Sequence, residues 1–229
     1  MSNYLFLFTI TNVQNFIKQA RKTQDLYVGS RLLSDLIGEG MKMFKDANGS
    51  FIFPKITTAT KPNRFLGKIT VENEEAIYKI GQDIEYKVKK DFLERAKGRV
   101  SKALNIKKNE LPLGFKEQID HLLDIKWVYT EVTGDYKEAH TKVEKLLAAH
   151  KNIREIKQYH YQQVKGEDNK WETIYGEKGR KCSVDGERNV KFYRKSDYDS
   201  KEEEVALLKK KLYIDNPQEV CFVPENTNP

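Results

Sequence analysis

The chain has 229 residues, 38% hydrophobic and 11% aromatic, enough for the core of one large domain, or of one domain with a small appendage. Its formal net charge of +7 suggests an acidic partner, most often nucleic acid, although a lysine-rich protein without such a partner has the same composition. The longest apolar run, residues 4–10, is too short to span a membrane and follows no basic signal segment, so we expect no membrane partner. The two cysteines show no paired spacing, which favours the reducing environment of the cytoplasm.

The first elements in chain order are a strand and two helices. Residues 4–10 are apolar nearly throughout, which predicts a strand covered on both faces. Thr11 and Asn12 can cap a short helix after it, and Asp25 begins a second helix. One side of these helices is expected in the core, including Phe16, Leu26, Leu33, Ile37 and Met41.

The following pattern predicts strands at 51–53 and 65–71, a charged helix over about 73–105, and a short helix after 114. A strand at 125–133 and a helix from 136 to about 153 follow. This order predicts an α+β fold with a ferredoxin-like, palm- or cyclase-type antiparallel sheet and helices on one face. We place a domain boundary after residue 158, with a small irregular C-terminal subdomain at 159–229.

The end of the first strand is the predicted binding region, because strand ends that open into helices are where nucleotides tend to bind. Thr9 and Thr11 stand where a metal-dependent nucleotidyl transferase needs paired carboxylates, so the chain alone is expected to be non-catalytic. No P-loop and no Gly-Gly-Asp-Asp sequence occur in it.

Two segments are strongly basic. Residues 79–116 have a local net charge of +6 and residues 178–195 of +5. Either could contact RNA phosphates, or could be an ordinary solvated surface. The candidate RNA-binding residues are Lys87, Lys89, Lys90, Arg188, Lys191 and Arg194.

The cysteines do not predict a metal site. Around Cys182, Asp185 occupies the place of a second thiolate, and Cys221 is isolated. A structural zinc ion needs four thiolate or imidazole ligands, so no zinc is expected.

The opening of the chain resembles the large subunit of type III CRISPR effector complexes, in the Cmr (III-B) branch. The resemblance is carried by Thr11-Asn12-Val13-Gln14, Phe16-Ile17, the stretch from Ala20 to Leu26, and the stretch from Gly29 to Ser34. Weaker matches are Pro62 to Leu66, the strand around Trp127, and Lys181-Cys182-Ser183 leading to Gly186-Glu187-Arg188, a degraded zinc knuckle.

The resemblance implies a first palm domain that binds ATP jointly with a second, Gly-Gly-Asp-Asp-bearing palm for cyclic oligoadenylate synthesis in antiviral defence. It implies that the second palm supplies most of the magnesium site. It also implies contacts with other Cmr-type subunits, guide RNA and target RNA. The chain would be an N-terminal piece or one half of a split subunit, without the HD nuclease domain. The candidate nucleotide-binding residues are Asn12, Gln14, Arg21, Gly29, Ser30, Arg31 and Ser34.

Alternatives stay open at this point. Asn12 and Gln14 could serve only as helix caps, and Ser30 and Ser34 only in helix packing. The whole chain could be a non-catalytic RNA-binding adaptor, or a palm-mimicking interaction protein.

Overall fold

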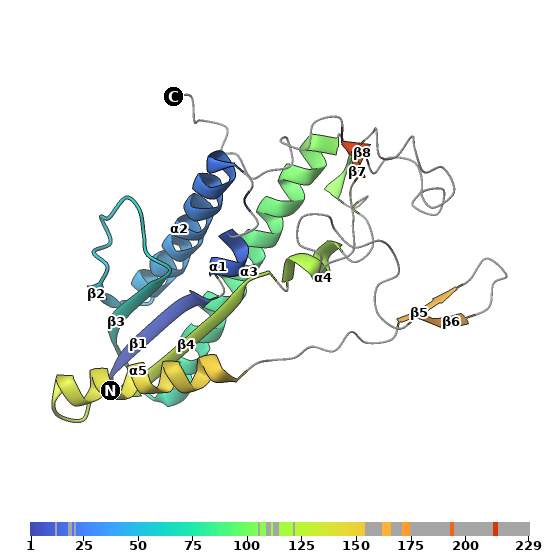
Figure 1. Cartoon of the computed structure of the whole chain (residues 1–229). Helices are drawn as coiled ribbons and strands as arrows, with labels where there is room; N and C mark the ends of the chain where they lie inside the picture. Colours follow the sequence, from blue (N-terminus) through green and yellow to red (C-terminus); the bar gives the residue numbers. More distant parts are fainter. Residues whose placement is uncertain are drawn as a thin grey trace.

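The computed structural model describes residues 1–11, 13–17, 20, 22–104, 106–108, 111, 115–120 and 122–153 apart from a few side chains, and the backbone of four short strands beyond them. The elements of the first part alternate between strands and helices along the chain (Figure 1). They are β1 (Ser2–Thr11), α1 (Val13–Ile17), α2 (Thr23–Asp46), β2 (Ser50–Phe53), β3 (Arg64–Val71), α3 (Glu74–Leu104), α4 (Phe115–Asp120), β4 (Asp124–Glu131) and α5 (Tyr136–Asn152).

Four strands form one antiparallel sheet in the order β2-β3-β1-β4. The central strand β1 pairs with β3 and β4, and Leu7 lies opposite both Leu66 and Val128. This order, with helices between β1 and β2 and between β3 and β4, is the ferredoxin-like arrangement. The predicted α+β class is therefore confirmed.

The main core lies between the sheet and the pair of helices α2 and α3. Phe6 and Phe8 of β1 pack there with Phe44 of α2 and Phe92 of α3, and all four are almost inaccessible to solvent. The predicted core positions Leu33, Ile37 and Met41 are buried there as well.

Leu26 is an exception, because 45% of its surface is exposed. It was predicted in the core because it lies on the same helical face as Leu33. The first turns of α2 extend beyond the end of the sheet, so that face has no strand beneath it at Leu26 (Figure 1). The side chain of Phe16 lies outside the described residues.

Helix α5 corrects the expectation that all helices pack on one face. Val143 and Leu147 of α5 pack against Leu7, Leu66 and Val128, which point away from α2 and α3. In Figure 1, α5 crosses in front of the sheet, and α2 and α3 run behind it. The apolar run of β1 requires cover on both faces, and α5 supplies the second.

Aromatic side chains continue the core along β4. The Trp127 ring stacks on Phe6 at a centroid distance of 6.1 Å, and its indole nitrogen donates to Glu85 Oε2 at 2.8 Å. Burial, helped by a hydrogen bond to Glu74, raises the pKa of Tyr129 to about 12.

Beyond residue 153 the structure describes two strand pairs only. Strand β5 (Gln162–Lys165) pairs with β6 (Trp171–Ile174), and β7 (Tyr193–Arg194) pairs with β8 (Tyr213–Ile214). The predicted domain boundary and irregular subdomain otherwise fall outside the described residues. Within the described part of the chain, no helix is long and apolar enough to cross a membrane.

Candidate functional site

A cleft of about 670 Å³ lies where β1 ends and α1 begins. This volume is within the range of small-molecule sites. Its lining joins the end of β1, helices α1 and α2, the loop before β3, the start of β4 and the end of α5. The apolar lining residues are Val13, Ile17, Leu33 and Pro62, and the polar or charged ones are Thr11, Gln14, Ser30, Ser34, Lys61, Asn63, Asp124 and Lys151.

The strand end carries hydroxyls and one carboxylate. The Thr9 hydroxyl is buried and donates to the Asn63 carbonyl at 3.2 Å. Thr11 is opposite Asp124 in the sheet, and its hydroxyl donates to the Asp124 carbonyl at 3.0 Å and to the Asp124 carboxylate. Lys126 Nζ lies 3.4 Å from the same carboxylate. Asp124 brings a single carboxylate from β4 to this strand end.

Three of the predicted nucleotide-binding residues line the cleft. Gln14 and Ser30 are solvent-exposed and are therefore accessible to a ligand. Ser34 is only 3% exposed, and its hydroxyl accepts a hydrogen bond from the Lys61 amide at 2.7 Å. Ser34 therefore holds the loop before β3 against α2.

The Lys61 side chain runs along α2 and away from Ser34. A Cβ at Gly38, one turn further along α2, would lie 3.4 Å from Lys61 Cδ, and Lys61 Nζ donates to the Thr58 carbonyl at 3.1 Å. The ammonium is thus held by its own loop, and its place in the cleft wall is set by the backbone bond to Ser34.

Two other predicted nucleotide-binding residues, Gly29 and Arg31, are described but do not line the cleft. Arg31 forms an ion pair with Asp35, with Arg31 Nε 3.1 Å from Asp35 Oδ1. Gly29 is half-buried in α2 and is absent from the lining. Asn12 and Arg21 lie outside the described residues.

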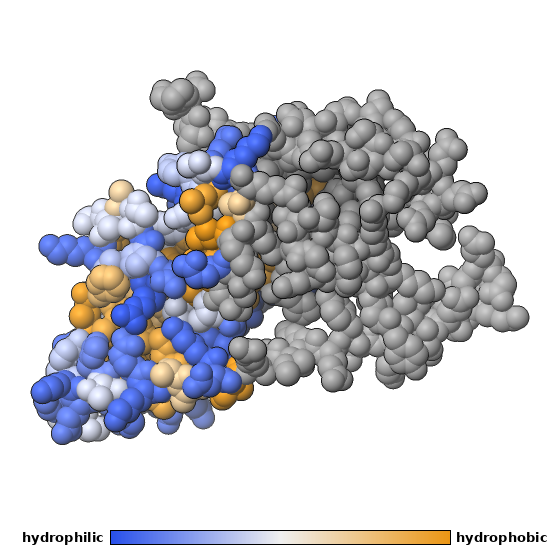
Figure 2. Space-filling model, viewed as in Figure 1, coloured by the Kyte–Doolittle hydropathy of each residue, from blue (hydrophilic) through white to orange (hydrophobic). Residues whose placement is uncertain are grey.

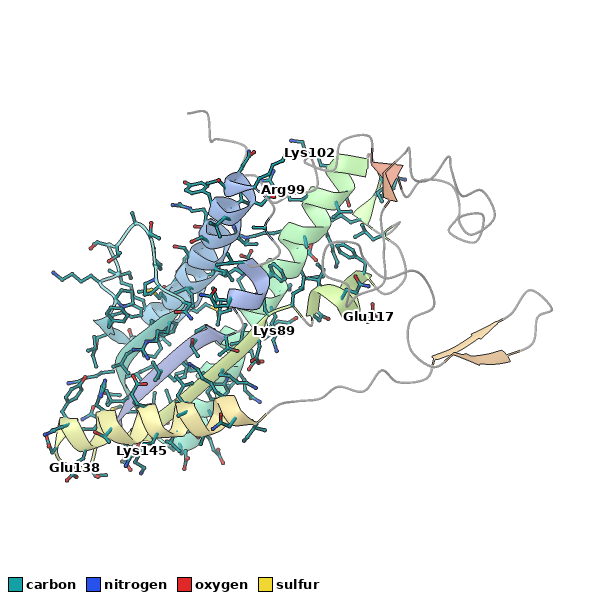
Figure 3. The ribbon with its side chains drawn as sticks, viewed as in Figure 1. Lys89, Arg99, Lys102, Glu117, Glu138 and Lys145 are labelled. Atoms are coloured by element: carbon teal, nitrogen blue, oxygen red, sulfur yellow. The ribbon has the colours of Figure 1, made fainter. Side chains whose placement is uncertain are left out.

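The predicted RNA-binding lysines of α3 differ in their surroundings. Lys89, labelled on α3 in Figure 3, has its Nζ 2.5 Å from Glu85 Oε1, so its charge is already paired. Lys87 and Lys90 are exposed, and Lys90 Nζ lies 5.8 Å from the centre of the Tyr86 ring. Arg188 and Lys191 lie outside the described residues, and of Arg194 only the backbone is described, in β7.

The described residues contain no group of three or more acidic, histidine or cysteine side chains that could hold a metal ion. Divalent magnesium is usually held by carboxylates together with phosphate oxygens. Asp124 alone therefore does not make a magnesium site. The cysteine segment around Cys182 lies outside the described residues.

Sequence reasoning missed Asp124, Asn63 and Lys151, which all line the cleft. Asp124 directly precedes the strand predicted at 125–133. If that strand pairs with β1 in antiparallel fashion, its first residues lie beside the last residues of β1. The pairing of these two strands was the signal that would have placed Asp124 beside Thr11.

Comparisons with known proteins agree with this architecture. Residues 5–111 match the family model for CRISPR-associated protein Cmr2, N-terminal. Among curated proteins, no match is found.

Two solved structures share the fold. The cryo-EM structure of type III-B Cmr-beta in the apo state superposes with a TM-score of 0.55 at 10% identity, over 96% of this chain and 31% of that one. The structure of type III-B Cmr-beta bound to cognate target RNA gives a TM-score of 0.53 at 12% identity, over 96% of this chain and 30% of that one. The chain thus spans about a third of the length of the chains it matches.

The matched region contains most of β1, all of α1, α2, β2, β3 and α3, and with them most of the cleft lining. It also contains the stretches at Thr11–Gln14 and Gly29–Ser34 that carry the resemblance seen in the sequence. Residues 5–111 are therefore similar to the N-terminal family of the CRISPR-associated protein Cmr2.

Proposed function

We propose that this chain is the first palm domain of a type III-B effector large subunit and forms one wall of a shared ATP site. The observation that carries the proposal is the cleft at the end of β1, where Gln14, Ser30 and Asp124 meet beside an apolar lining. Ligand sites commonly combine apolar walls with a few convergent polar groups. A position where a strand ends and a helix begins is also typical of nucleotide sites.

The chemistry of the cleft favours a binding role over a catalytic one. The apolar lining suits a base, and the Gln14 amide and Ser30 hydroxyl can hydrogen-bond to a nucleotide. Asp124 can accept hydrogen bonds from ribose hydroxyls. Magnesium bound to ATP would neutralise phosphate charge, and its remaining carboxylate ligands would come from a second palm. We infer that cyclic oligoadenylate synthesis needs both palms.

Calorimetric titration with ATP tests this proposal, on the chain alone and on the chain with its second palm half. We expect the second half to tighten binding. Ser30→Phe should then weaken ATP binding at least about tenfold, because a large ring at the lining fills the cleft. Gln24→Phe is the matched control, since Gln24 is an exposed position of α2 that is absent from the lining.

Two results would contradict the proposal. Equal ATP affinity for Ser30→Phe and Gln24→Phe would remove the cleft from the binding site. Magnesium-dependent ATP turnover by the isolated chain would contradict the argument from the single carboxylate.

The same proposal includes contacts with other effector subunits and with guide and target RNA. One of the similar solved structures is bound to cognate target RNA. The exposed Lys87 and Lys90 favour such a contact, and they also support the second candidate function, an RNA-binding adaptor that does not use ATP. An adaptor would bind RNA and leave ATP unbound in the titration above.

A further inference from the structure

The face of the sheet that carries α5 is only partly covered. Helix α5 packs over β4 and β1, and β2 lies at the far edge of the sheet. At this edge three large apolar side chains reach solvent: Ile52 is 41% exposed, Phe53 47% and Ile56 39%. Figure 2 shows hydrophobic residues at the surface over β2, at the left of the molecule. Single exposed apolar residues are ordinary, but a cluster of them marks an interaction site.

The charge of this edge has one sign. Residues 47–71, which include β2 and β3, contain four basic residues and no acidic one, in a chain with 34 acidic residues. Arg64 is neutralised by Glu144 of α5 at 3.2 Å, and Lys61 Nζ is turned to Thr58. Lys55 and Lys68 are exposed, and Lys68 Nζ lies 5.0 Å from the centre of the Tyr136 ring. An acidic partner would meet a complementary charge here.

The backbone of β2 adds a third feature. In the sheet β2 pairs with β3 on one side, and its other side is an edge. An edge strand has unpaired N–H and C=O groups that can pair with an extended segment of another protein.

We propose that a surface made of Ile52, Phe53, Lys55, Ile56 and Lys68, which we call the basic edge, docks an acidic protein segment that carries apolar side chains. The segment belongs to another subunit of the effector complex, so this inference rests on the proposed function. A protein fits better than single-stranded RNA, because two of the three apolar side chains are isoleucines, and RNA bases stack on aromatic rings. Carboxylates of the segment pair with Lys55 and Lys68.

Site-specific photo-crosslinking tests the proposal in the complex reconstituted from this chain and the other subunits of its effector complex. Benzoylphenylalanine replaces Ile52 in the full chain, and in a control it replaces Tyr86, an exposed residue of α3. We expect a crosslink from position 52 to an acidic segment of one subunit, identified by peptide mass spectrometry, and none to that segment from position 86.

A charge reversal provides the second measurement. Lys55→Glu should weaken incorporation of the chain into the complex about tenfold, because like charges face each other across the interface. Replacing an acidic residue of the crosslinked partner segment with lysine should restore incorporation of the Lys55→Glu chain. The thermal midpoint of the free chain should stay unchanged, because Lys55 is exposed.

The outcomes separate this inference from the proposed function. A complex that assembles without any crosslink from position 52, or with a crosslink to RNA, overturns the docking of a protein segment and leaves the proposed function standing. Failure of the unmodified chain to assemble with the subunits overturns both.

Discussion

Two glycines of α3 have opposite surroundings. A Cβ added at Gly81 would lie 2.5 Å from ring atoms of Trp127, closer than real side chains approach. The Trp127 indole is fixed there by its hydrogen bond to Glu85 and its stacking on Phe6. A Cβ at Gly98 would have no heavy atom within 4 Å. The first glycine therefore permits close packing of α3 on β4, and the second has no packing role.

This contrast predicts opposite effects of the same substitution. Gly81→Ala should lower the free energy of unfolding by about 1–3 kcal/mol, because the indole must be displaced. Gly98→Ala should raise it by roughly 0.5–1 kcal/mol, because alanine is the better helix former. Urea unfolding measures both changes. Equal effects at the two positions would show that Trp127 does not pack against α3 as described.

Among the elements, α5 determines how the second face of the sheet is buried. Leu147 is 2% exposed and contacts Leu7 and Leu66, while the adjacent Leu146 is 40% exposed. Leu147→Ala should therefore cost about 2–4 kcal/mol of unfolding free energy, and Leu146→Ala less than about 1 kcal/mol. Thermal unfolding of the two variants is the measurement. A smaller loss for Leu147→Ala than for Leu146→Ala would place α5 elsewhere.

The sequence predicts these elements well because each leaves a local signal. Apolar and β-branched runs, turn residues and helical spacing identified every strand of the main sheet and its helices to within a few residues. Helix α2 begins at Thr23, two residues before the expected Asp25, and Asp25 in its first turn accepts a hydrogen bond from the Lys22 amide at 3.2 Å. The side of the sheet on which α5 packs has no local signal, because an amphipathic helix fits either face equally well.

The candidate site depends on longer-range information. Gln14 and Ser30 were named because they lie in the stretches Thr11–Gln14 and Gly29–Ser34 that carry the resemblance, and both line the cleft. Asp124 is more than a hundred positions from Thr11 and reaches it only through the pairing of β1 with β4. Ser34 also lines the cleft, but its bond to the Lys61 amide depends on a loop whose path the sequence does not specify.

At the scale of the whole molecule, the net charge of +7 is compatible with RNA binding, and the surroundings of each lysine determine which ones can contact RNA phosphates. Lys87 and Lys90 of α3 are exposed, whereas Lys89 is paired with Glu85. Figure 3 shows Lys145 on α5, which lies on the other side of the sheet from α3.

These positions predict the salt dependence of RNA binding. Lys87→Gln and Lys90→Gln should each reduce the slope of log affinity against log salt by about 0.7 for single-stranded RNA. Lys145→Gln should leave the slope unchanged. Fluorescence anisotropy over a range of salt concentrations provides the measurement. A reduced slope for Lys145→Gln alone would move the RNA contact to α5.

One amide–hydroxyl pair joins the cleft to the basic edge. Lys61 follows β2 in the same loop as Lys55 and Ile56, and its N–H is bonded to Ser34 in the wall of the cleft. A subunit that shifted this loop on docking would also shift that wall. Thermodynamic linkage then makes the effect reciprocal, so that ATP in the cleft would alter the affinity for the subunit by the same factor. Assembly with the subunit would then change the fraction of clefts that hold ATP, and ATP would change the fraction of chains that are assembled.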